Sequence, residues 1–87
     1  MECSVEISMY PLDKDYIQPI TSFILRLGKH PFIKLETNGM STQVFGDYDK
    51  VMSAINKEMK NSFLDSQKVV FNFKVINSHL QEKPIIK

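Results

Sequence analysis

The sequence is poor in the residues that most often build metal sites, disulfides and membrane spans. Its 87 residues include no tryptophan, three glycines, two histidines and one cysteine, Cys3. A single cysteine excludes an intramolecular disulfide and any metal site built on paired cysteines. No apolar run approaches the roughly 20 residues of a transmembrane helix, so direct membrane insertion is not expected. The first residues, Met1-Glu2-Cys3-Ser4, lack both a basic region and a signal core, which predicts a cytoplasmic protein.

A strong charge of either sign is also missing. Eleven basic and ten acidic side chains leave a formal charge of +1, so no strong field would attract nucleic acid or anionic lipid. Hydrophobic residues make up 43% and charged residues 24% of the chain, values typical of a globular domain. Because so short a chain buries only about 60–65% of its surface, its stability should be modest and self-association would add much to it.

What the sequence does contain is clear hydrophobic periodicity. Apolar and polar residues alternate from Cys3 to Met9, which predicts a half-buried strand that Pro11 ends, with Cys3 as a buried, inert thiol. A helix follows, with Asp13 or Asp15 as its possible N-terminal cap and Gly28 as its end. Its apolar residues at helical spacing are Ile17, Ile20, Ile24 and Leu27.

The second half of the chain repeats this alternation of strand and helix. Residues 32–37 and 40–45 read as a hairpin around an Asn38-Gly39 turn, and Gly46-Asp47 ends the second strand. Asp47 can cap a helix that frays near Asn61-Ser62. Residues 68–76 alternate again and predict the last strand. The apolar stripe of the second helix comprises Tyr48, Val51, Met52, Ile55 and Met59.

The order β-α-β-β-α-β predicts an α+β fold of the ferredoxin-like type, with both helices on one face of a four-stranded antiparallel sheet. We expect a single domain over residues 1–78 and a loose tail over residues 79–87, where Pro84 prevents regular pairing. The other face of the sheet is left open. It should display Ser4, Glu6, Ser8, Tyr10, Lys34, Glu36, Ser41, Gln43, Phe45, Val70, Asn72 and Lys74. On the face that the helices cover, the expected core contacts are Cys3, Val5, Ile7, Leu35, Val44, Phe71 and Phe73.

No catalytic constellation is visible, so no enzyme activity is expected. The two histidines, His30 in a loop and His79 in the tail, lie beside no nucleophile and read as surface residues. The only arginine, Arg26, falls in mid-helix rather than in a phosphate-binding loop. Phe71 and Phe73 belong to the last strand and the core, which does not fit an RNA-recognition surface.

A dense polar run, residues 36–43, crosses the hairpin turn, and two interpretations of it are possible. One is ordinary turn chemistry with an exposed strand face. The other is a hydrogen-bonding wall whose hydroxyls and amides suit a neutral heteroaromatic ligand better than a phosphate or a metal. Glu6, across the sheet, could hold a cation or pair with Lys74 or Lys34.

The runs ISMYPL (residues 7–12) and ETNGMSTQVFG (residues 36–46) resemble the two signatures of YkoF-like thiamin/hydroxymethylpyrimidine-binding domains. The resemblance covers nearly the whole chain. It implies a ferredoxin-like fold, a non-enzymatic role without a cofactor, and a thiamin or aminopyrimidine ligand in uptake or salvage of vitamin B1. Matching the motif carries over Ser8, Tyr10, Thr37, Asn38, Ser41, Thr42 and Gln43 as ligand-binding candidates.

The founding members of this family carry two such domains in tandem. The resemblance therefore implies that this single domain forms a homodimer or homotetramer, in which another copy supplies the second wall of the ligand site. One hypothesis places the pyrimidine ring between Tyr10 and Phe45 or Met40, while Thr42 and Gln43 bind its nitrogens. Glu6 would then balance a thiazolium charge. The alternative is a regulatory or structural oligomerisation module, similar to amino-acid-sensing ferredoxin-like domains, whose open face only joins subunits.

Overall fold

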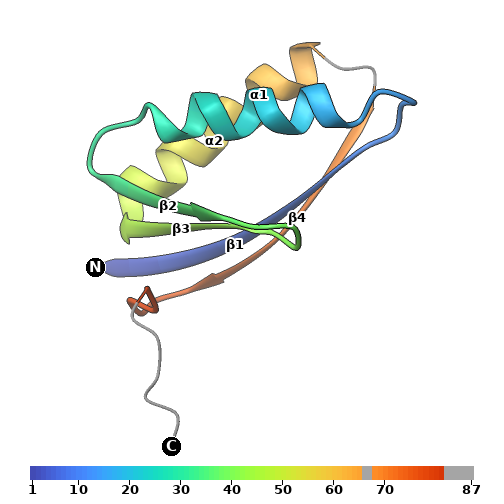
Figure 1. Ribbon diagram of the computed structural model, residues 1–87. Helices are drawn as coiled ribbons and strands as arrows, with labels where there is room; N and C mark the ends of the chain where they lie inside the picture. Colours follow the sequence, from blue (N-terminus) through green and yellow to red (C-terminus); the bar gives the residue numbers. More distant parts are fainter. Residues whose placement is uncertain (66–67, 82–87) are drawn as a thin grey trace, which may run out of the picture.

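The computed structural model describes residues 1–65 and 68–81. Both helices lie on the same side of one sheet, and the other side of the sheet carries no helix (Figure 1). The predicted ferredoxin-like α+β fold is confirmed. The elements in chain order are β1 (Glu2–Pro11), α1 (Ile17–Gly28), β2 (Ile33–Thr37), β3 (Thr42–Asp47), α2 (Tyr48–Asp65) and β4 (Val69–Ile76).

The sheet has the order β2-β3-β1-β4, with every neighbouring pair antiparallel. Its two central strands overlap only in part. The ladder between β1 and β3 stops at the pair Ile7–Thr42, whereas β1 pairs with β4 as far as Pro11–Val69. Beyond Ile7, β1 therefore has a strand neighbour on one side only, and the sheet has a notch beside the end of the hairpin.

The core lies between the sheet and the helices. Phe23 and Leu27 of α1 are almost fully buried, and the ring of Phe23 packs 5.0 Å from that of Phe71 on β4. Cys3 is completely buried, as expected, and burial is the largest of the effects that raise the pKa of its thiol. The remaining buried core residues are Val5, Ile7, Val44, Val51, Ala54 and Ile55.

Helix α1 begins close to the predicted caps, and its predicted stripe is confirmed at Leu27, which is buried, and at Ile24, which packs against the core, but not at Ile17. The Asp15 carboxylate accepts the backbone N–H of Gln18 (3.4 Å), and Pro19 lies in the first turn, where no intrahelical bond is lost. Ile17, predicted to be apolar and inward, is 63% exposed. Six residues at 3.6 per turn place it about 120° from the direction of Phe23, and Phe23 is the residue that reaches the core.

Helix α2 is longer than predicted. The Asp47 carboxylate accepts the backbone N–H of Lys50 (3.4 Å), which confirms its role as a cap. The helix then continues to Asp65, past the fraying point expected at Asn61-Ser62, because Ser62 is buried against α1. Tyr48, expected in the apolar stripe, is exposed. Within the described part of the chain, no helix is long and apolar enough to cross a membrane.

The hairpin has a wider connection than the predicted two-residue turn. Strand β2 ends at Thr37 and β3 starts at Thr42, because Asn38 holds the loop together with its side chain. Asn38 Oδ1 accepts the backbone N–H groups of Met40 (2.8 Å) and Ser41 (3.2 Å). The loop thus keeps Met40 and Ser41 out of the ladder.

Gly46 and Asp47 are part of β3, although the sequence predicted that they end it. Gly46 has φ +155°, and a Cβ atom there would stand 3.0 Å from the carbonyl oxygen of Phe32. Glycine is therefore needed for the close approach of β2 to β3, not for a turn.

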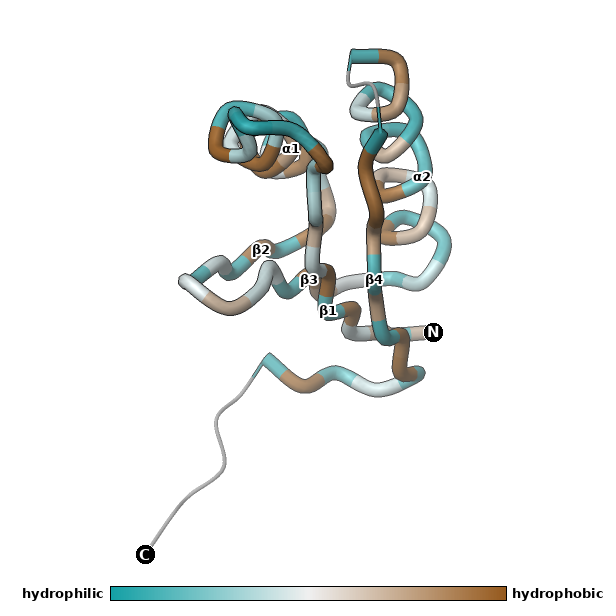
Figure 2. The backbone as a smooth tube through the Cα atoms, turned by 90° about the vertical axis from the view of Figure 1, so that its right-hand side faces the viewer, coloured by the Kyte–Doolittle hydropathy of each residue, from teal (hydrophilic) through white to brown (hydrophobic). Residues whose placement is uncertain are grey.

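The segment after β4 turns back beneath the face that the helices leave uncovered (Figure 2). Ser4 Oγ donates to the carbonyl oxygen of Ser78 (2.7 Å) and accepts the N–H of Leu80 (2.9 Å). The ring of His79 lies 5.9 Å from that of Phe45. The predicted loose tail began at residue 79, but His79 and Leu80 are held against the sheet by these contacts. Residues 82–87 of that tail lie outside the described residues.

Candidate functional site

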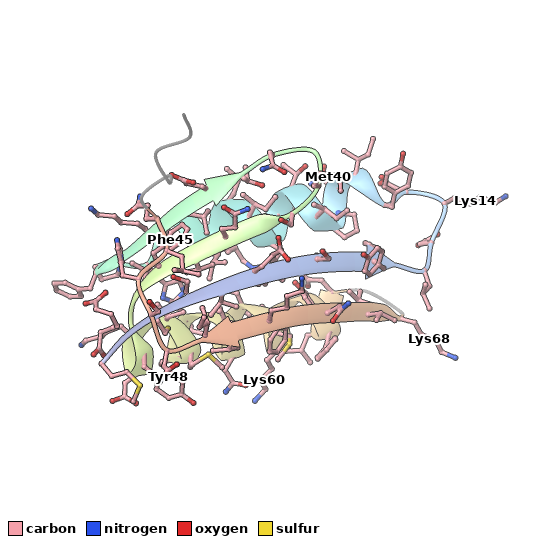
Figure 3. All side chains as sticks on the ribbon, turned by 90° about the horizontal axis from the view of Figure 1, so that it is seen from below. Lys14, Met40, Phe45, Tyr48, Lys60 and Lys68 are labelled. Atoms are coloured by element: carbon pink, nitrogen blue, oxygen red, sulfur yellow. The ribbon has the colours of Figure 1, made fainter. Side chains whose placement is uncertain are left out.

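A cavity of about 220 Å³ lies where the notch in the sheet meets the end of the hairpin and helix α1. We call it the hairpin-end pocket. Figure 3 labels Met40 at the tip of the hairpin. The apolar lining of the pocket comes chiefly from β1 and α1, namely Ile7, Met9, Ile20, Phe23 and Ile24. Its polar lining comprises Ser8, Tyr10, Thr37, Asn38, Ser41 and Thr42.

The pocket combines an apolar wall with hydroxyl and amide groups, and none of the described residues that line it is charged at neutral pH. A charged ligand would find no compensating side chain in it, and burying an unpaired charge is costly. An aromatic ring with polar atoms on its edge would match both parts of the lining. The cavity is therefore suited to a neutral heteroaromatic group.

Six of the nine site residues predicted from the sequence gather in this pocket: Ser8, Tyr10, Thr37, Asn38, Ser41 and Thr42. The other three, Glu6, Gln43 and Phe45, lie elsewhere, on the open face of the sheet. Thr42 and Gln43 are neighbours in β3, so their side chains point to opposite faces. The hypothesis that both bind one ring, and that Tyr10 and Phe45 enclose it, does not match this geometry.

The threonine pair fixes part of the hydrogen-bonding capacity of the pocket. Thr37 and Thr42 are cross-strand partners whose Oγ1 atoms are 2.9 Å apart, so one hydroxyl donates to the other. A single hydroxyl proton of the pair remains for a ligand. Asn38 has its oxygen occupied by the loop, so its amide N–H groups are what it can offer. These three residues therefore offer hydroxyl and amide donors on one wall of the pocket.

The exposed end of β1 adds backbone groups to the site. Because the β1–β3 ladder ends at Ile7–Thr42, the backbone of Ser8, Met9 and Tyr10 has no β3 partner on the side that faces the hairpin loop. Consecutive residues of a strand alternate in the direction of their N–H and C=O groups. At least one donor–acceptor pair of the main chain therefore faces the notch.

A second hollow, of about 330 Å³, lies on the open face and is mainly apolar. We call it the open-face hollow. Phe45, Val75, Ile76 and Leu80 supply its apolar lining, and Glu6, Gln43 and Lys74 supply polar groups. Of the two roles weighed for Glu6, the structure shows the ion pair: Glu6 Oε1 lies 3.6 Å from Lys74 Nζ. Ser41 Oγ donates to the other Glu6 oxygen at 3.0 Å.

Sequence reasoning missed a buried polar group between the helices. Glu58 of α2 is only 5% exposed, and its carboxylate accepts from Arg26 Nε (3.0 Å) and Asn61 Nδ2 (3.0 Å) and lies 2.6 Å from His30 Nε2. Arg26 also donates to Ser62 Oγ (2.7 Å). We call these five residues the interhelical cluster. Burial alone would raise the pKa of Glu58, but the hydrogen bonds from His30, Asn61 and Arg26 hold it below its ordinary value.

A signal for this cluster was present in the sequence. Glu58 and Ser62 continue the spacing of Val51 and Ile55 along one face of α2, so a buried position was indicated for both. His30, expected at the surface, is drawn inward by Glu58. In the described ranges 1–65 and 68–81, no three His, Cys, Asp or Glu residues come together as a metal site.

The sequence profile of the YKOF-related family matches residues 2–79, nearly the full length of the chain. The protein belongs to the YKOF-related family. This confirms the resemblance seen in the two sequence runs. No curated protein matches the chain at a significant level.

Solved structures share the fold of this chain. A hypothetical protein of Methanocaldococcus jannaschii is 27% identical, with a TM-score of 0.76 over 97% of this chain and 88% of its own. A protein of Streptococcus pneumoniae superposes with a TM-score of 0.83 at 18% identity, covering 92% of this chain and 90% of its own. A protein of Thermotoga maritima, proposed to act in thiamine biosynthesis or salvage, has a TM-score of 0.80 at 16% identity, over 90% of this chain and 85% of its own. The last two likenesses show the fold alone.

Proposed function

We propose that this protein binds the aminopyrimidine ring of thiamin, or free hydroxymethylpyrimidine, in uptake or salvage of vitamin B1. The observation that carries the proposal is the hairpin-end pocket, where uncharged donors and acceptors surround an apolar wall. Membership of the YKOF-related family and the role proposed for the Thermotoga neighbour support the same ligand class.

The size of the pocket favours the pyrimidine over the whole vitamin. Its volume of about 220 Å³ is below the range of roughly 300–1,000 Å³ that is typical of drug-sized ligands. One six-membered ring with small substituents fits such a space, and the thiazolium ring of thiamin would lie outside it. At the rim, Met40 is 88% exposed and Tyr10 is 52% exposed, and both can cover a ring that reaches the mouth.

The pocket supports binding rather than chemistry. Among the residues that the structure describes, Tyr10 is the only titratable side chain in the lining, and no acid–base pair or activated nucleophile faces the cavity. The ligand would be held by hydrogen bonds to Thr37, Thr42, Asn38 and the backbone of β1, and released unchanged. A carrier or sensor role therefore fits better than catalysis.

Calorimetric titration with hydroxymethylpyrimidine, thiamin and thiamin phosphate tests the proposal. We expect saturable binding of all three ligands, with no gain in affinity from the phosphate, because no cationic side chain lines the pocket. A ligand that binds the folded chain should also raise its melting temperature. If none of the three produces heat or a thermal shift at millimolar concentration, the proposed function is wrong.

The open-face hollow favours a second candidate function, the assembly of subunits. Its apolar side chains Ile76 and Leu80 are both partly exposed, and a second copy of this chain would cover them in a homodimer or homotetramer. Ile76→Lys separates the two functions, because Ile76 pairs with Ser4 on the open face and does not line the hairpin-end pocket. Light scattering should show dissociation with ligand affinity unchanged. An unaltered oligomer would exclude this face as the interface.

A further inference from the structure

Ser41 connects the hairpin-end pocket with the opposite face of the sheet. It lines the pocket from the hairpin loop, while its hydroxyl donates to Glu6 Oε2 at 3.0 Å. Its backbone is already fixed by Asn38, which accepts the Ser41 N–H and donates its own N–H to the Ser41 carbonyl (3.1 Å). The freedom left to Ser41 is therefore that of its side chain, namely its χ1 angle and the direction of its hydroxyl proton.

Glu6 determines that direction. It stands on β1 between two cross-strand neighbours, Gln43 on β3 and Lys74 on β4, and Lys74 Nζ lies 3.6 Å from its second oxygen. An ionised carboxylate only accepts hydrogen bonds. A serine hydroxyl has one proton, so once that proton points to Glu6, the oxygen of Ser41 has only lone pairs for any other partner.

We propose that Glu6 is a positioning residue that sets the hydrogen-bond polarity of the hairpin-end pocket through Ser41. The inference rests on the proposed function and refines it. With the proton of Ser41 committed to Glu6, the pocket has an acceptor at this point, in the same loop as the amide donors of Asn38. It accepts a ligand that presents an N–H group to Ser41, such as an exocyclic amine, and rejects a ligand that presents a carbonyl oxygen there.

The location of Ser41 supports this reading. The last ladder pair is Ile7–Thr42, so the next positions on the two strands, Ser8 and Ser41, face each other across the notch and on the same face as Glu6. Both residues line the pocket. Glu6 itself does not, so it acts on a ligand only through Ser41.

Two ligands that differ in one group provide the test. Hydroxymethylpyrimidine carries an exocyclic amino group, and its oxo counterpart has a carbonyl at that position. We expect the natural protein to prefer the amino form by about tenfold or more, because a site that is built for one hydrogen-bond pattern penalises the reverse pattern. Both affinities are measured by calorimetry on the full chain.

Glu6→Gln is the decisive variant. The glutamine amide can donate to Ser41 Oγ, which frees the hydroxyl proton to turn toward the ligand. The preference for the amino form should then fall to about threefold or less, while the melting temperature changes by no more than about 2 °C. Ser41→Ala should lose the preference as well, and adding Glu6→Gln to it should change nothing further.

Glu36→Gln is the matched control, because Glu36 is an exposed carboxylate on the same face, opposite Gln43, and lines neither cavity. It should keep the full preference. If Glu6→Gln keeps it too, or if the natural protein binds both ligands equally, this inference is overturned while the proposed function stands. If the natural protein binds neither ligand, the proposed function fails, and the inference with it.

Discussion

The interhelical cluster and the hairpin-end pocket both bring polar side chains into partly buried places, but they use them differently. In the cluster, both oxygens of Glu58 are hydrogen-bonded, and Arg26 contacts Glu58 and Ser62 together. In the pocket, Asn38 and the pair Thr37–Thr42 spend only part of their capacity on each other and on the loop. Glu58 is committed to partners within the cluster, whereas the pocket keeps unused hydrogen-bonding groups for a ligand.

If this comparison holds, mutating the cluster should change stability, and mutating the pocket should change affinity. Glu58→Ala should have the largest effect. It removes the carboxylate and leaves Arg26 with an uncompensated charge, which costs about 3 kcal/mol of unfolding free energy, the lower end of the usual range because Arg26 is partly exposed. Urea unfolding measures the loss. Glu36→Ala, an exposed carboxylate, should cost under about 0.5 kcal/mol, and equal losses in the two variants would contradict the account.

The cluster should also make stability fall in acid. Hydrogen bonds hold the pKa of Glu58 in the folded chain below its ordinary value of 4.5, so the unfolded chain takes up this proton first as the pH falls. The contribution is complete at neutral pH and is lost as the pH drops below about 4.5 and through the folded pKa. The Asp47 carboxyl, whose pKa is lowered mainly by the backbone N–H of Lys50, acts in the same direction.

Glu58→Gln separates the two carboxylates, because it leaves Asp47 in place. Unfolding free energies of the natural protein and this variant, measured between pH 7 and pH 3, should converge as the pH falls. Parallel curves would mean that Glu58 does not titrate differently in the folded and unfolded chains.

On the pocket side, Asn38→Ala should act chiefly on binding. It removes the two hydrogen bonds that shape the loop and the amide that faces the pocket, so affinity for hydroxymethylpyrimidine should fall about tenfold. Because Asn38 is exposed, unfolding should become easier by only about 1 kcal/mol. The two values come from calorimetry and urea unfolding, and a large loss of stability with unchanged affinity would reverse the expected pattern.

The smallest effect is expected for Lys74→Met. The ion pair with Glu6 is long, at 3.6 Å, and the lysine side chain is 87% exposed. Pairs of this kind contribute at most about 0.5 kcal/mol. Chemical unfolding should show no resolvable change, and a loss above about 1 kcal/mol would indicate that Glu6 depends on this lysine more strongly than the geometry suggests.

The sequence predicted the fold well because the fold depends on local periodicity. Alternation in β1 and β4, the cap at Asp47 and the position of Asp15 just before α1 placed most elements within a few residues. Errors arose where side chains made specific local bonds or close approaches. The Asn38 side chain widened the turn, and the contact between Gly46 and Phe32 explains a glycine that had been read as a strand end.

The candidate site was predicted in part for the same reason. A contiguous run supplied Thr37, Asn38, Ser41 and Thr42, but alternation in β3 divides that run between two faces, so Gln43 leaves the pocket. Contacts between distant residues could not be read from the pattern. His79 and Leu80 reach the sheet through Ser4 and Phe45, more than 30 residues away in each case, and His30 reaches Glu58 across the helices.

Thr42→Val tests the central claim most directly, because it removes one hydroxyl from the wall of the pocket and keeps the shape of the side chain. We expect calorimetry to show at least about a tenfold loss of affinity for hydroxymethylpyrimidine, since the site loses a hydrogen-bonding group at a buried position. Thr21→Val, at an exposed position of α1, is the control and should bind as the natural protein does. Equal affinity in Thr42→Val and the natural protein would contradict the assignment of this pocket as the ligand site.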